Sequence, residues 1–318
     1  MKNFWEKLKK PILALAPMAG ITDSAFRQLC KDFGTDVVYS EMISTDGLYY
    51  EGKKTLKLVE FKKKEKPVLF QLFGKNPELF GPAAKLIEKK GGDGVDINFG
   101  CPAPKIYKYG GGVKLMRDLD LCYQIVKKTC QAVKIPVSIK IRRSIKLQNS
   151  NEEITAINLI KKIKDLPVKA IMIHGRSYEQ GFKEEPDFEM IKKVKRIFPG
   201  IVLGNGGVTS PEKAKKMISE TGVDGIGLAQ GVLGKPWLFE QIKTYLKTGQ
   251  YQELEIDQIK KIAYKHAKLN FQFKGKQGIM EARKHLAWYI KGFNGASELR
   301  QQLVQVTNLS QIKKLLKI

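Results

Sequence analysis

A short apolar run recurs eight times within the first 230 residues, and turn residues and a stretch of helical periodicity follow the runs. The runs lie at 12–16, 36–41, 68–72, 94–98, 137–141, 170–174, 201–204 and 225–229. Apolar residues recur at helical spacing in the intervening stretches 77–90, 119–133, 152–165, 187–198 and 211–220. Strands and helices alternating in this number predict an α/β fold of the TIM (β/α)8 barrel type.

A doubly wound open sheet is the alternative fold, but its phosphate-binding glycines follow the first strand. Here Gly204, Gly206 and Gly207 lack the full glycine spacing and follow the seventh run. From about residue 253 the strands end, and 256–273, 280–291 and 301–317 have the periodicity of about three amphipathic helices. We therefore predict a barrel domain at 1–250 and a small all-helical domain at 251–318.

The chain is strongly basic, with 57 Lys and Arg against 32 Asp and Glu and a net charge of +25. Part of this excess lies on solvated helix faces and fits a lysine-rich composition, but the remainder predicts a polyanionic partner. RNA, DNA and an anionic membrane surface satisfy that requirement equally. No apolar run approaches the length of a membrane span, so we expect a protein that does not cross the membrane.

Cysteine usage indicates a reducing compartment. Cys30, Cys101, Cys122 and Cys130 show neither Cys-x-x-Cys spacing nor clustering with histidine, so we expect no metal site and no disulfide framework. We expect a cytoplasmic protein.

The N-terminal segment has one competing interpretation. Lysines precede the apolar run 12–16, and Ala14-Leu15-Ala16 resembles a signal-peptidase site. The run is very short and is bounded by Pro11 and Pro17, and it serves well as the first barrel strand. We therefore assign it to the barrel.

Polar residues and glycines gather where the predicted strands end. TIM-barrel sites lie at the carboxyl ends of the strands, so side chains at these positions share one rim. Any one of them alone would more often be structural, but their joint placement predicts a binding site. They are Pro17-Met18-Ala19-Gly20, Gln71, Asn98 with Cys101, Lys140 with Arg142, His174 with Arg176, and Asn205-Gly206-Gly207.

These residue types suit a flavin. A flavin needs donors to its pyrimidine ring, a positive charge near nitrogen 1 and backbone amides around its phosphate. Gln71 and Lys140 can supply the first two, and the glycine-rich turns at 204–207 and 230–231 can supply the third. Cys101 follows the fourth strand, and a thiol with a pKa of about 8.5 is mostly protonated at neutral pH and can donate a proton. The other cysteines fall on predicted helices, where we expect them to be packed.

The motifs at these positions resemble those of the tRNA-dihydrouridine synthases, most closely the bacterial B-type branch. The resemblance covers nearly the whole chain. Its motifs are Leu-Ala-Pro-Met-Ala-Gly-Ile-Thr-Asp at 15–23, Asp-Ile-Asn-Phe-Gly-Cys-Pro at 96–102, Ile-Lys-Ile-Arg at 139–142, Ile-His-Gly-Arg at 173–176, Gly-Asn-Gly-Gly at 204–207, Gly-x-Pro-Trp at 234–237 and Arg-Lys-His-Leu at 283–286.

The resemblance implies FMN at the barrel mouth and NADPH as its reductant. It implies that hydride passes from the flavin to carbon 6 of a uracil in tRNA, while Cys101 protonates carbon 5. Asn98, Arg142 and Lys140 would contact the flipped uracil, and Arg283 and Lys284 would contact the RNA. The residues implied to contact FMN are Pro17, Met18, Ala19, Gln71, Lys140, His174, Asn205, Gly206, Gly207, Ala229 and Gln230.

One position departs from the family pattern. The family usually has Gly-Arg after the eighth strand, and this chain has Ala229-Gln230. The loss of a cation beside the phosphate predicts a lower affinity for FMN than in relatives. We expect a monomer, and which uridine is reduced, or whether rRNA is a substrate, stays open.

Two other functions share many of these features. A small-molecule flavoprotein of the dihydroorotate or dihydropyrimidine dehydrogenase kind has the same barrel, but does not account for the lysines and aromatic residues interleaved at 260–291. A non-catalytic RNA-binding protein could keep the barrel as a scaffold. Cys101 beside a complete rim argues against that second alternative.

Overall fold

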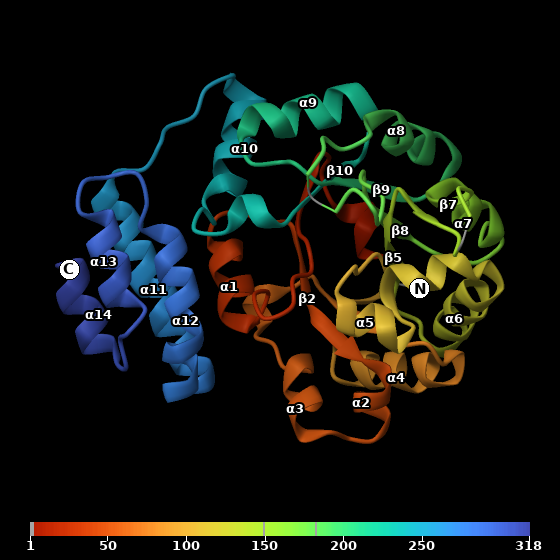
Figure 1. Ribbon diagram of the computed structural model, residues 1–318, viewed down its shortest axis with the longest axis horizontal. Coiled ribbons are helices and arrows are strands. Elements are labelled where there is room, and N and C mark those ends of the chain that lie inside the picture. Colours follow the sequence, from red (N-terminus) through yellow and green to blue (C-terminus); the bar gives the residue numbers. More distant parts are fainter. Residues whose placement is uncertain (1–2, 149, 182) are drawn as a thin grey trace.

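The computed structural model describes residues 3–148, 150–181 and 183–318. Among these residues, eight parallel strands form a closed barrel in the order β1-β10-β9-β8-β5-β4-β3-β2, so the predicted TIM barrel is confirmed (Figure 1). The barrel strands are β1 (Ile12–Leu15), β2 (Val37–Ser44), β3 (Val68–Phe73), β4 (Gly94–Phe99), β5 (Val137–Arg142), β8 (Ala170–His174), β9 (Ile201–Asn205) and β10 (Gly225–Leu228).

Helices surround the barrel, and polar side chains fix where most of them begin. Asp23, Asn76, Asp118, Asp187 and Ser210 each accept a hydrogen bond from a backbone N–H in the first turn of the helix that follows. No helix among the described residues is long and apolar enough to cross a membrane. The helices of the barrel are α1 (Ser24–Asp32), α4 (Pro77–Lys89), α6 (Leu119–Ala132), α7 (Ala156–Lys162), α8 (Phe188–Ile197), α9 (Pro211–Thr221) and α10 (Leu238–Thr248).

Shorter elements fill the connections. A two-stranded hairpin, β6 (Ser144–Lys146) with β7 (Glu153–Thr155), follows β5. Its second strand occupies the start of the stretch predicted as one helix at 152–165. The remaining short elements are α2 (Thr45–Tyr49), α3 (Lys53–Leu56), α5 (Pro104–Tyr109), η1 (Phe4–Lys7), η2 (Lys57–Val59), η3 (Lys63–Glu65), η4 (Gly112–Arg117) and η5 (Gln230–Val232).

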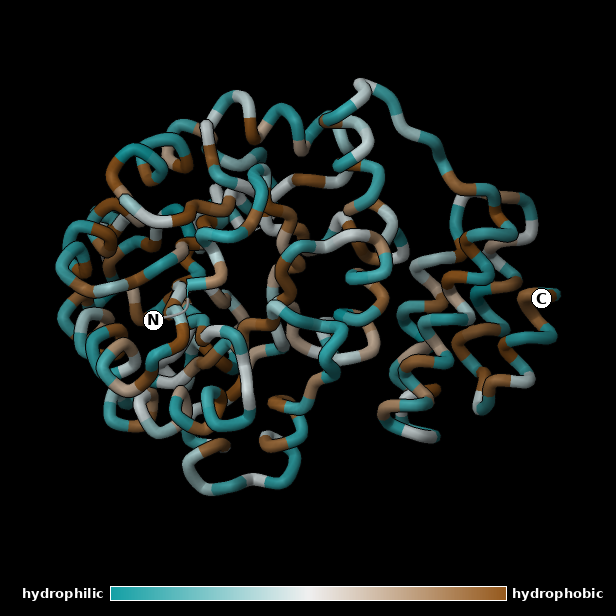
Figure 2. Tube along the Cα trace, turned by 180° about the vertical axis from the view of Figure 1, so that it is seen from behind, coloured by the Kyte–Doolittle hydropathy of each residue, from teal (hydrophilic) through white to brown (hydrophobic). Residues whose placement is uncertain are grey.

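The barrel interior is apolar at the amino ends of the strands. Side chains alternate along a strand, so Ile12, Ala14 and residues at matching positions on other strands point inward. They form one buried cluster with Trp5 of η1, which includes Tyr39, Leu69, Ala170, Met172 and Leu203. The larger cluster lies between the strands and the outer helices. In Figure 2 hydrophobic and hydrophilic segments alternate along the helices, as expected when one helix face is buried.

Strand β2 contains a β-bulge. Its register against β3 shifts between Tyr39 and Met42, and the backbone N–H of Gln71 donates to Ser40 Oγ at 3.0 Å. The sequence predicts that this strand ends at residue 41, but it continues to Ser44. The extra length and the bulge place Met42 beside Gln71 near the carboxyl end of the barrel.

The C-terminal segment forms four helices rather than the predicted three. They are α11 (Ile256–Lys274), α12 (Lys276–Tyr289), α13 (Ala296–Leu303) and α14 (Leu309–Leu316). The predicted single helix at 301–317 is wrong, because the chain leaves the helix after Leu303 and begins a new one at Asn308. The Asn308 side chain accepts from Gln311 N–H and so favours a fresh start there.

The four C-terminal helices lie on one side of the barrel, beside α1 (Figure 1). Phe26 of α1 stacks on the imidazole ring of His266, with the ring centroids 5.3 Å apart, and the tilted ring of His285 lies 5.6 Å away. At one end of this contact the Lys274 ammonium lies 2.7 Å from an Asp23 carboxylate oxygen. Helix α1 therefore belongs to the barrel and to the packing of the C-terminal helices at once.

A buried ion pair fixes α1 to the segment that leads into β3. Arg27 is 2% exposed and Glu65 is 0% exposed, and Arg27 Nε donates to Glu65 at 2.6 Å. The guanidinium also donates to Thr22 O and Glu60 O, and Glu65 accepts from Ser24 Oγ. The pair is fully hydrogen-bonded, which a buried pair of charges requires.

We predict that Glu65→Gln lowers the free energy of unfolding by about 3 kcal/mol, because the change leaves a buried guanidinium without its counter-charge. Urea unfolding would measure this loss. The matched control is Glu78→Gln, since Glu78 pairs with Lys128 on the surface and is 68% exposed. The control should lose less than about 1 kcal/mol. Equal losses in the two variants would contradict this account of the pair.

Candidate active site

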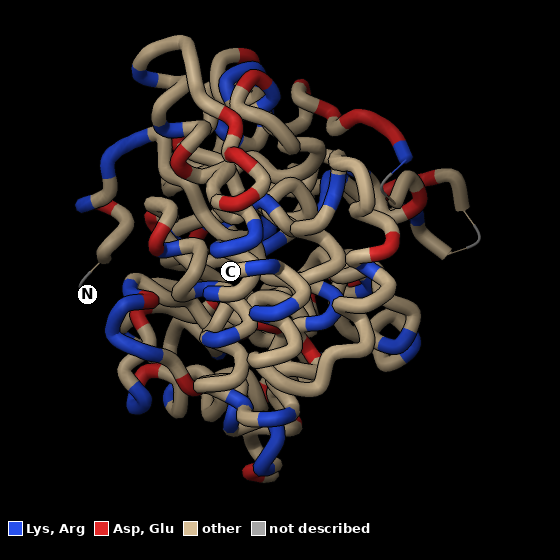
Figure 3. The backbone as a smooth tube through the Cα atoms, turned by 90° about the vertical axis from the view of Figure 1, so that its left-hand side faces the viewer, with Lys and Arg blue, Asp and Glu red and all other residues tan. Residues whose placement is uncertain are grey.

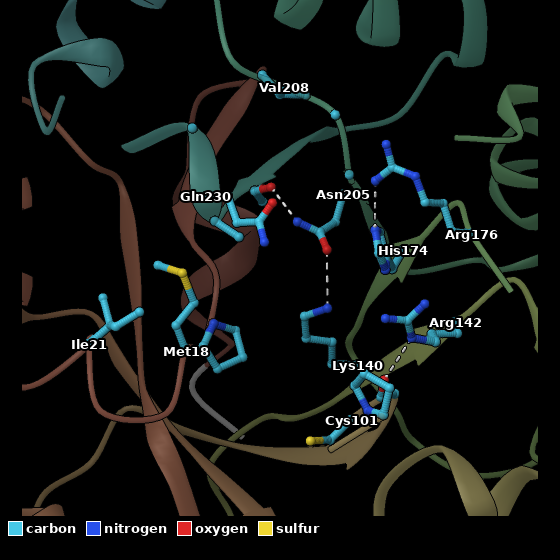
Figure 4. Close-up of a pocket in the computed structure, with 18 of the residues that line it drawn as sticks. Met18, Ile21, Cys101, Lys140, Arg142, His174, Arg176, Asn205, Val208 and Gln230 are labelled. Atoms are coloured by element: carbon cyan, nitrogen blue, oxygen red, sulfur yellow. Dashed lines mark hydrogen bonds between the residues drawn. The ribbon is translucent and has the colours of Figure 1, made fainter. Parts of the chain in front are cut away.

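A cavity of about 530 Å³ opens at the carboxyl ends of the barrel strands. Its volume lies within the range of small-molecule sites. Figure 4 shows Cys101, Lys140 and His174 on one side of the cavity and Met18 and Ile21 on the other. The structure brings together around it all the residues that the sequence assigns to cofactor, uracil and proton transfer. These are Pro17, Met18, Ala19, Gln71, Asn98, Cys101, Lys140, Arg142, His174, Asn205, Gly206, Gly207, Ala229 and Gln230.

Cys101 is half-buried on the loop that follows β4. Asn98 Oδ1 accepts hydrogen bonds from the N–H groups of Gly100 and Cys101, at 3.0 and 2.9 Å, and so holds the start of this loop. Burial raises the pKa of the Cys101 thiol above its ordinary value, against the opposing effects of the Ala103 N–H and of Lys140. The thiol is therefore protonated at neutral pH and can act as an acid.

Gln71 lies beside Asn98 at the carboxyl end of β3 and is buried. Its amide nitrogen donates to Asp96 at 2.6 Å, and its carbonyl oxygen accepts from Asn98 Nδ2 at 2.9 Å. Asn98 Nδ2 also lies 2.9 Å from the sulfur of Met42. Both amides are thus held by neighbours on β2, β3 and β4.

Two cations project into the cavity from β5. Lys140 Nζ donates to Asn205 Oδ1 at 3.1 Å, and burial lowers the pKa of Lys140 to about 8, helped by nearby Arg142. Arg142 donates to Gly100 O at 3.0 Å and to Ser177 O at 2.7 Å. Burial lowers the pKa of Arg142 to about 10, so it stays protonated at neutral pH. These charges favour a ligand that carries or develops negative charge beside β5.

His174 is a neutral imidazole at the end of β8. Burial lowers its pKa to about 2, and the positive charges of Lys140, Arg142 and Arg176 act in the same direction. Its Nε2 lies 3.4 Å from Arg176 Nη1. Among the described residues, no group of three or more His, Cys, Asp and Glu side chains is placed to hold a metal ion. His174 can therefore serve as a hydrogen-bonding group for a bound molecule.

The turn after β9 approaches His174 closely. A Cβ atom on Gly206 would lie 2.6 Å from His174 Cδ2, and Gly206 has φ +112° and Gly207 φ +71°. Glycine is therefore required at Gly206 on two grounds. The backbone N–H groups of Gly207 and Val208 donate to no acceptor within the described ranges. Adjacent amides of this kind suit a phosphate.

The cavity also contains residues that sequence reasoning missed. Met42 was missed because the bulge and the true end of β2 could not be read from the sequence. Lys213 follows the Ser210 cap of α9, and Glu185 lies on the loop before α8. Neither residue directly follows a strand, so its position in the sequence does not mark it as part of the rim. Arg176 and Gly231 also line the cavity, as expected from their places beyond the strand ends. The other additional lining residues are Ile21, Met42, Gly100, Pro102, Ala103, Glu185, Val208, Thr209, Lys213, Gly227 and Leu233.

Arg283 and Lys284, predicted to contact RNA, lie on α12 outside the cavity. Arg283 donates to Val306 O at 2.8 Å and to Gln305 O at 3.2 Å, so it ties α12 to the segment between α13 and α14. The Lys284 ammonium donates to Gly20 O, on the loop that carries Met18. Both side chains are half-buried and have structural contacts, so a test of RNA binding needs other residues.

A solved structure resembles the barrel. The 6-hydroxypseudooxynicotine amine oxidase from Pseudomonas geniculata N1 aligns with a TM-score of 0.56 and 15% sequence identity. The alignment covers 74% of this chain and 47% of that one, so this chain spans about half the length of the oxidase. At this identity the likeness concerns the fold alone.

Sequence relatives are much closer. The chain is 34% identical over 304 residues to the probable tRNA-dihydrouridine synthase 1 of Synechocystis sp., covering 95% of this chain and 84% of that protein. It is 34% identical to the tRNA-dihydrouridine synthase B of Pseudomonas aeruginosa, covering 91% of this chain and 87% of that protein. It is 35% identical to the enzyme of the same name from Vibrio vulnificus, covering 91% and 89%. The sequence model of the family described as dihydrouridine synthase (Dus) matches residues 14–318, and the chain therefore belongs to the dihydrouridine synthase family.

Proposed function

We propose that this protein is a tRNA-dihydrouridine synthase that uses FMN and NADPH to reduce the uracil 5,6 double bond of uridines in the D-loop of tRNA. The observation that carries the proposal is the cavity in which a protonated thiol, Cys101, lies with the buried cation Lys140 and the glycine turn after β9. The names of the relatives from Pseudomonas aeruginosa and Vibrio vulnificus support tRNA as the substrate.

The residues around the cavity fit FMN. Gln71 and Lys140 would hold the pyrimidine side of the ring, with Lys140 close to nitrogen 1, and His174 and Asn205 would adjoin it. Gly206, Gly207 and Val208 would place backbone amides around the phosphate. Gln230 carries no charge, so the backbone amides and the exposed ammonium of Lys213 would bind the FMN phosphate. When bound and reduced by NADPH, FMN would supply the hydride for carbon 6 of the uracil.

The remaining cavity residues would act on the uracil. A base must leave its stack to be reached, and side-chain hydrogen bonds then identify it. Arg142 and Lys140 would bind its carbonyl oxygens. Asn98 would offer the base the N–H that now points to the Met42 sulfur, and would keep its hydrogen bonds to Gln71 and to the loop N–H groups. Cys101 would give its proton to carbon 5, because burial keeps the thiol protonated until the carbon develops negative charge.

The chain would divide the work between two regions. We assign FMN binding and catalysis to residues 1–250 and RNA docking to residues 251–318. The second region contains 13 Lys and Arg against 5 Asp and Glu. In Figure 3 blue Lys and Arg segments are spread over the helices around the C-terminus. Within this proposal the protein acts as a monomer in the cytoplasm.

The direct test uses the purified chain with FMN, NADPH and a tRNA transcript that lacks modifications. We expect dihydrouridine in the RNA, detected by mass spectrometry of nuclease digests, and NADPH consumption that depends on the RNA. Orotate and free uracil serve as the competing small substrates, because each has a 5,6 double bond that NADPH-reduced flavin could reduce. Turnover of these without any product in tRNA would favour a small-molecule dehydrogenase instead.

We predict that Cys101→Ala keeps bound flavin and its reduction by NADPH but loses about 100- to 10,000-fold in the rate of dihydrouridine formation, because only the protonation of carbon 5 needs the thiol. Cys130→Ala is the matched control, since Cys130 is also half-buried but lies on α6 outside the cavity. The control should retain wild-type rates. Wild-type turnover in Cys101→Ala would remove Cys101 from the proposed role.

We predict that Lys140→Met binds FMN weakly and that any flavin it retains is reduced slowly, because the charge beside nitrogen 1 is gone. Flavin absorbance and stopped-flow reduction measure the two effects. Lys31→Met is a matched control: burial also lowers the pKa of Lys31 to about 8, but Lys31 bonds to Asp36 O and lies outside the cavity. Normal flavin content and reduction in Lys140→Met would contradict the assignment.

For RNA docking we predict that Lys276→Glu weakens tRNA binding and flattens the log–log salt dependence of affinity by roughly 0.7 to 0.9 for each phosphate that the protein no longer neutralises. Lys276 is exposed at the start of α12, two residues from Lys274, which pairs with Asp23 beside the cavity loop.

The control for this charge reversal is Lys317→Glu. Lys317 is also exposed, but it precedes the C-terminus, which lies on the side of the C-terminal helices away from the barrel in Figure 1. We expect a smaller change in its salt slope. Equal slopes for wild type and Lys276→Glu would mean that this end of the C-terminal helices does not contact RNA. The full chain is used throughout, because truncation would expose the packed face of α1.

A further inference from the structure

Three hydrogen-bonded side chains run from the barrel interior to the Cys101 loop. Asp96 Oδ2 accepts from Gln71 Nε2 at 2.6 Å, and Gln71 Oε1 accepts from Asn98 Nδ2 at 2.9 Å. Asn98 Oδ1 then accepts from the backbone N–H groups of Gly100 and Cys101. The series begins at a buried carboxylate and ends at the backbone of the residue that carries the thiol.

The carboxylate determines which way each amide faces. An ionised carboxylate only accepts hydrogen bonds, whereas an amide has a donating end and an accepting end. Gln71 must therefore turn its nitrogen toward Asp96 and its oxygen toward Asn98. Asn98 must in turn present its nitrogen to Gln71, which leaves its oxygen for the N–H groups of Gly100 and Cys101. Reversal of either amide would set two donors or two acceptors against each other.

Asp96 is completely buried among polar side chains of the neighbouring strands. Its second oxygen, Oδ1, accepts from Ser138 Oγ at 2.6 Å. Burial raises the pKa of Asp96 to about 6, while the hydrogen bonds from Ser138 and Gln71 and the charge of Lys140 oppose the rise. The buried phenol of Tyr39 is the other titratable group close to it. The carboxyl is therefore ionised, and acts only as an acceptor, at neutral pH.

A buried carboxylate is costly for the fold, because burial disfavours its charge. The raised pKa means that Asp96 ionises less readily in the folded chain than in the unfolded chain, so its ionisation lowers the stability of the fold as the pH rises toward neutrality. An apolar side chain in the barrel interior would avoid that cost. The cost points to a role in the site rather than in folding.

We propose that Asp96 is a positioning residue that fixes the orientation of Gln71 and Asn98 and thereby the placement of Cys101. Its importance for catalysis rests on the proposed function of Cys101. The geometric part concerns the thiol alone and can be tested without RNA or NADPH.

The test measures the rate at which a small methanethiosulfonate reagent modifies Cys101 in the protein as purified. A Cys130→Ser background removes the other half-buried thiol, and peptide mass spectrometry confirms the modified residue. We expect Asp96→Ala to raise the rate about tenfold, because Asn98 loses its fixed orientation and the loop gains freedom. Asp96→Asn should stay near the wild-type rate, since its carbonyl oxygen can still accept from Gln71.

Ser138→Ala is the matched control. It removes the hydrogen bond to the other oxygen of Asp96 and leaves the bond to Gln71 in place. Its thiol reactivity should equal that of wild type. An increase as large as that of Asp96→Ala would overturn the proposal, because it would reflect loosened packing and not the orientation of the amides.

Wild-type reactivity in folded Asp96→Ala would overturn the positioning role. The proposed function fails separately, through an absence of dihydrouridine in tRNA. If both hold, dihydrouridine formation should fall in Asp96→Ala and recover in Asp96→Asn.

Discussion

Closure of the parallel sheet is the constraint on which the site depends. β1 pairs with β10 over four residues, from Ile12 with Gly225 to Leu15 with Leu228. A Cβ on Gly225 would lie 2.1 Å from Ile12 O, and one on Gly227 would lie 2.6 Å from the sulfur of Met172. The glycines of β10 therefore allow the last strand to approach the first and leave room for Met172. Once the sheet closes, the carboxyl ends of all eight strands meet at one rim.

The interior of the closed barrel is apolar at one end and polar at the other. Near the amino ends of the strands, Trp5, Tyr39 and aliphatic side chains fill the space. Near the carboxyl ends, Asp96, Lys140 and the amides of Gln71, Asn98 and Asn205 are buried with nearly all their polar atoms bonded. Polar groups buried in this way are rigid, because each partner restricts the next. The rigidity supplies the fixed geometry that a reaction site needs.

Much of this arrangement could be predicted from the sequence, and the reasons for success and failure are physical. Lys140 and His174 could be placed near the carboxyl ends of their strands because the apolar runs stop there. In a closed barrel these ends lie at one rim, so the two side chains come together. The bulge that brings Met42 to the cavity depends on a hydrogen bond between Ser40 and Gln71 from different strands, which no local pattern reveals. The break between α13 and α14 was missed because the apolar periodicity continues across the Asn308 cap. Arg283 and Lys284 stand in a recognisable motif, but only the structure gives their backbone partners.

Helix α1 connects the barrel with the C-terminal helices in a way that bears on how such proteins can be recombined. Phe26 faces His266 and His285, while the next residue, Arg27, faces inward to Glu65. Lys274 and Lys284 add contacts to the loop that precedes α1. Two consecutive residues of α1 thus make contacts with the C-terminal helices and with the barrel. A chimera that joins this barrel to the C-terminal helices of a relative would also need the face of α1 that packs against those helices. The segment that must be exchanged is therefore larger than residues 251–318 alone.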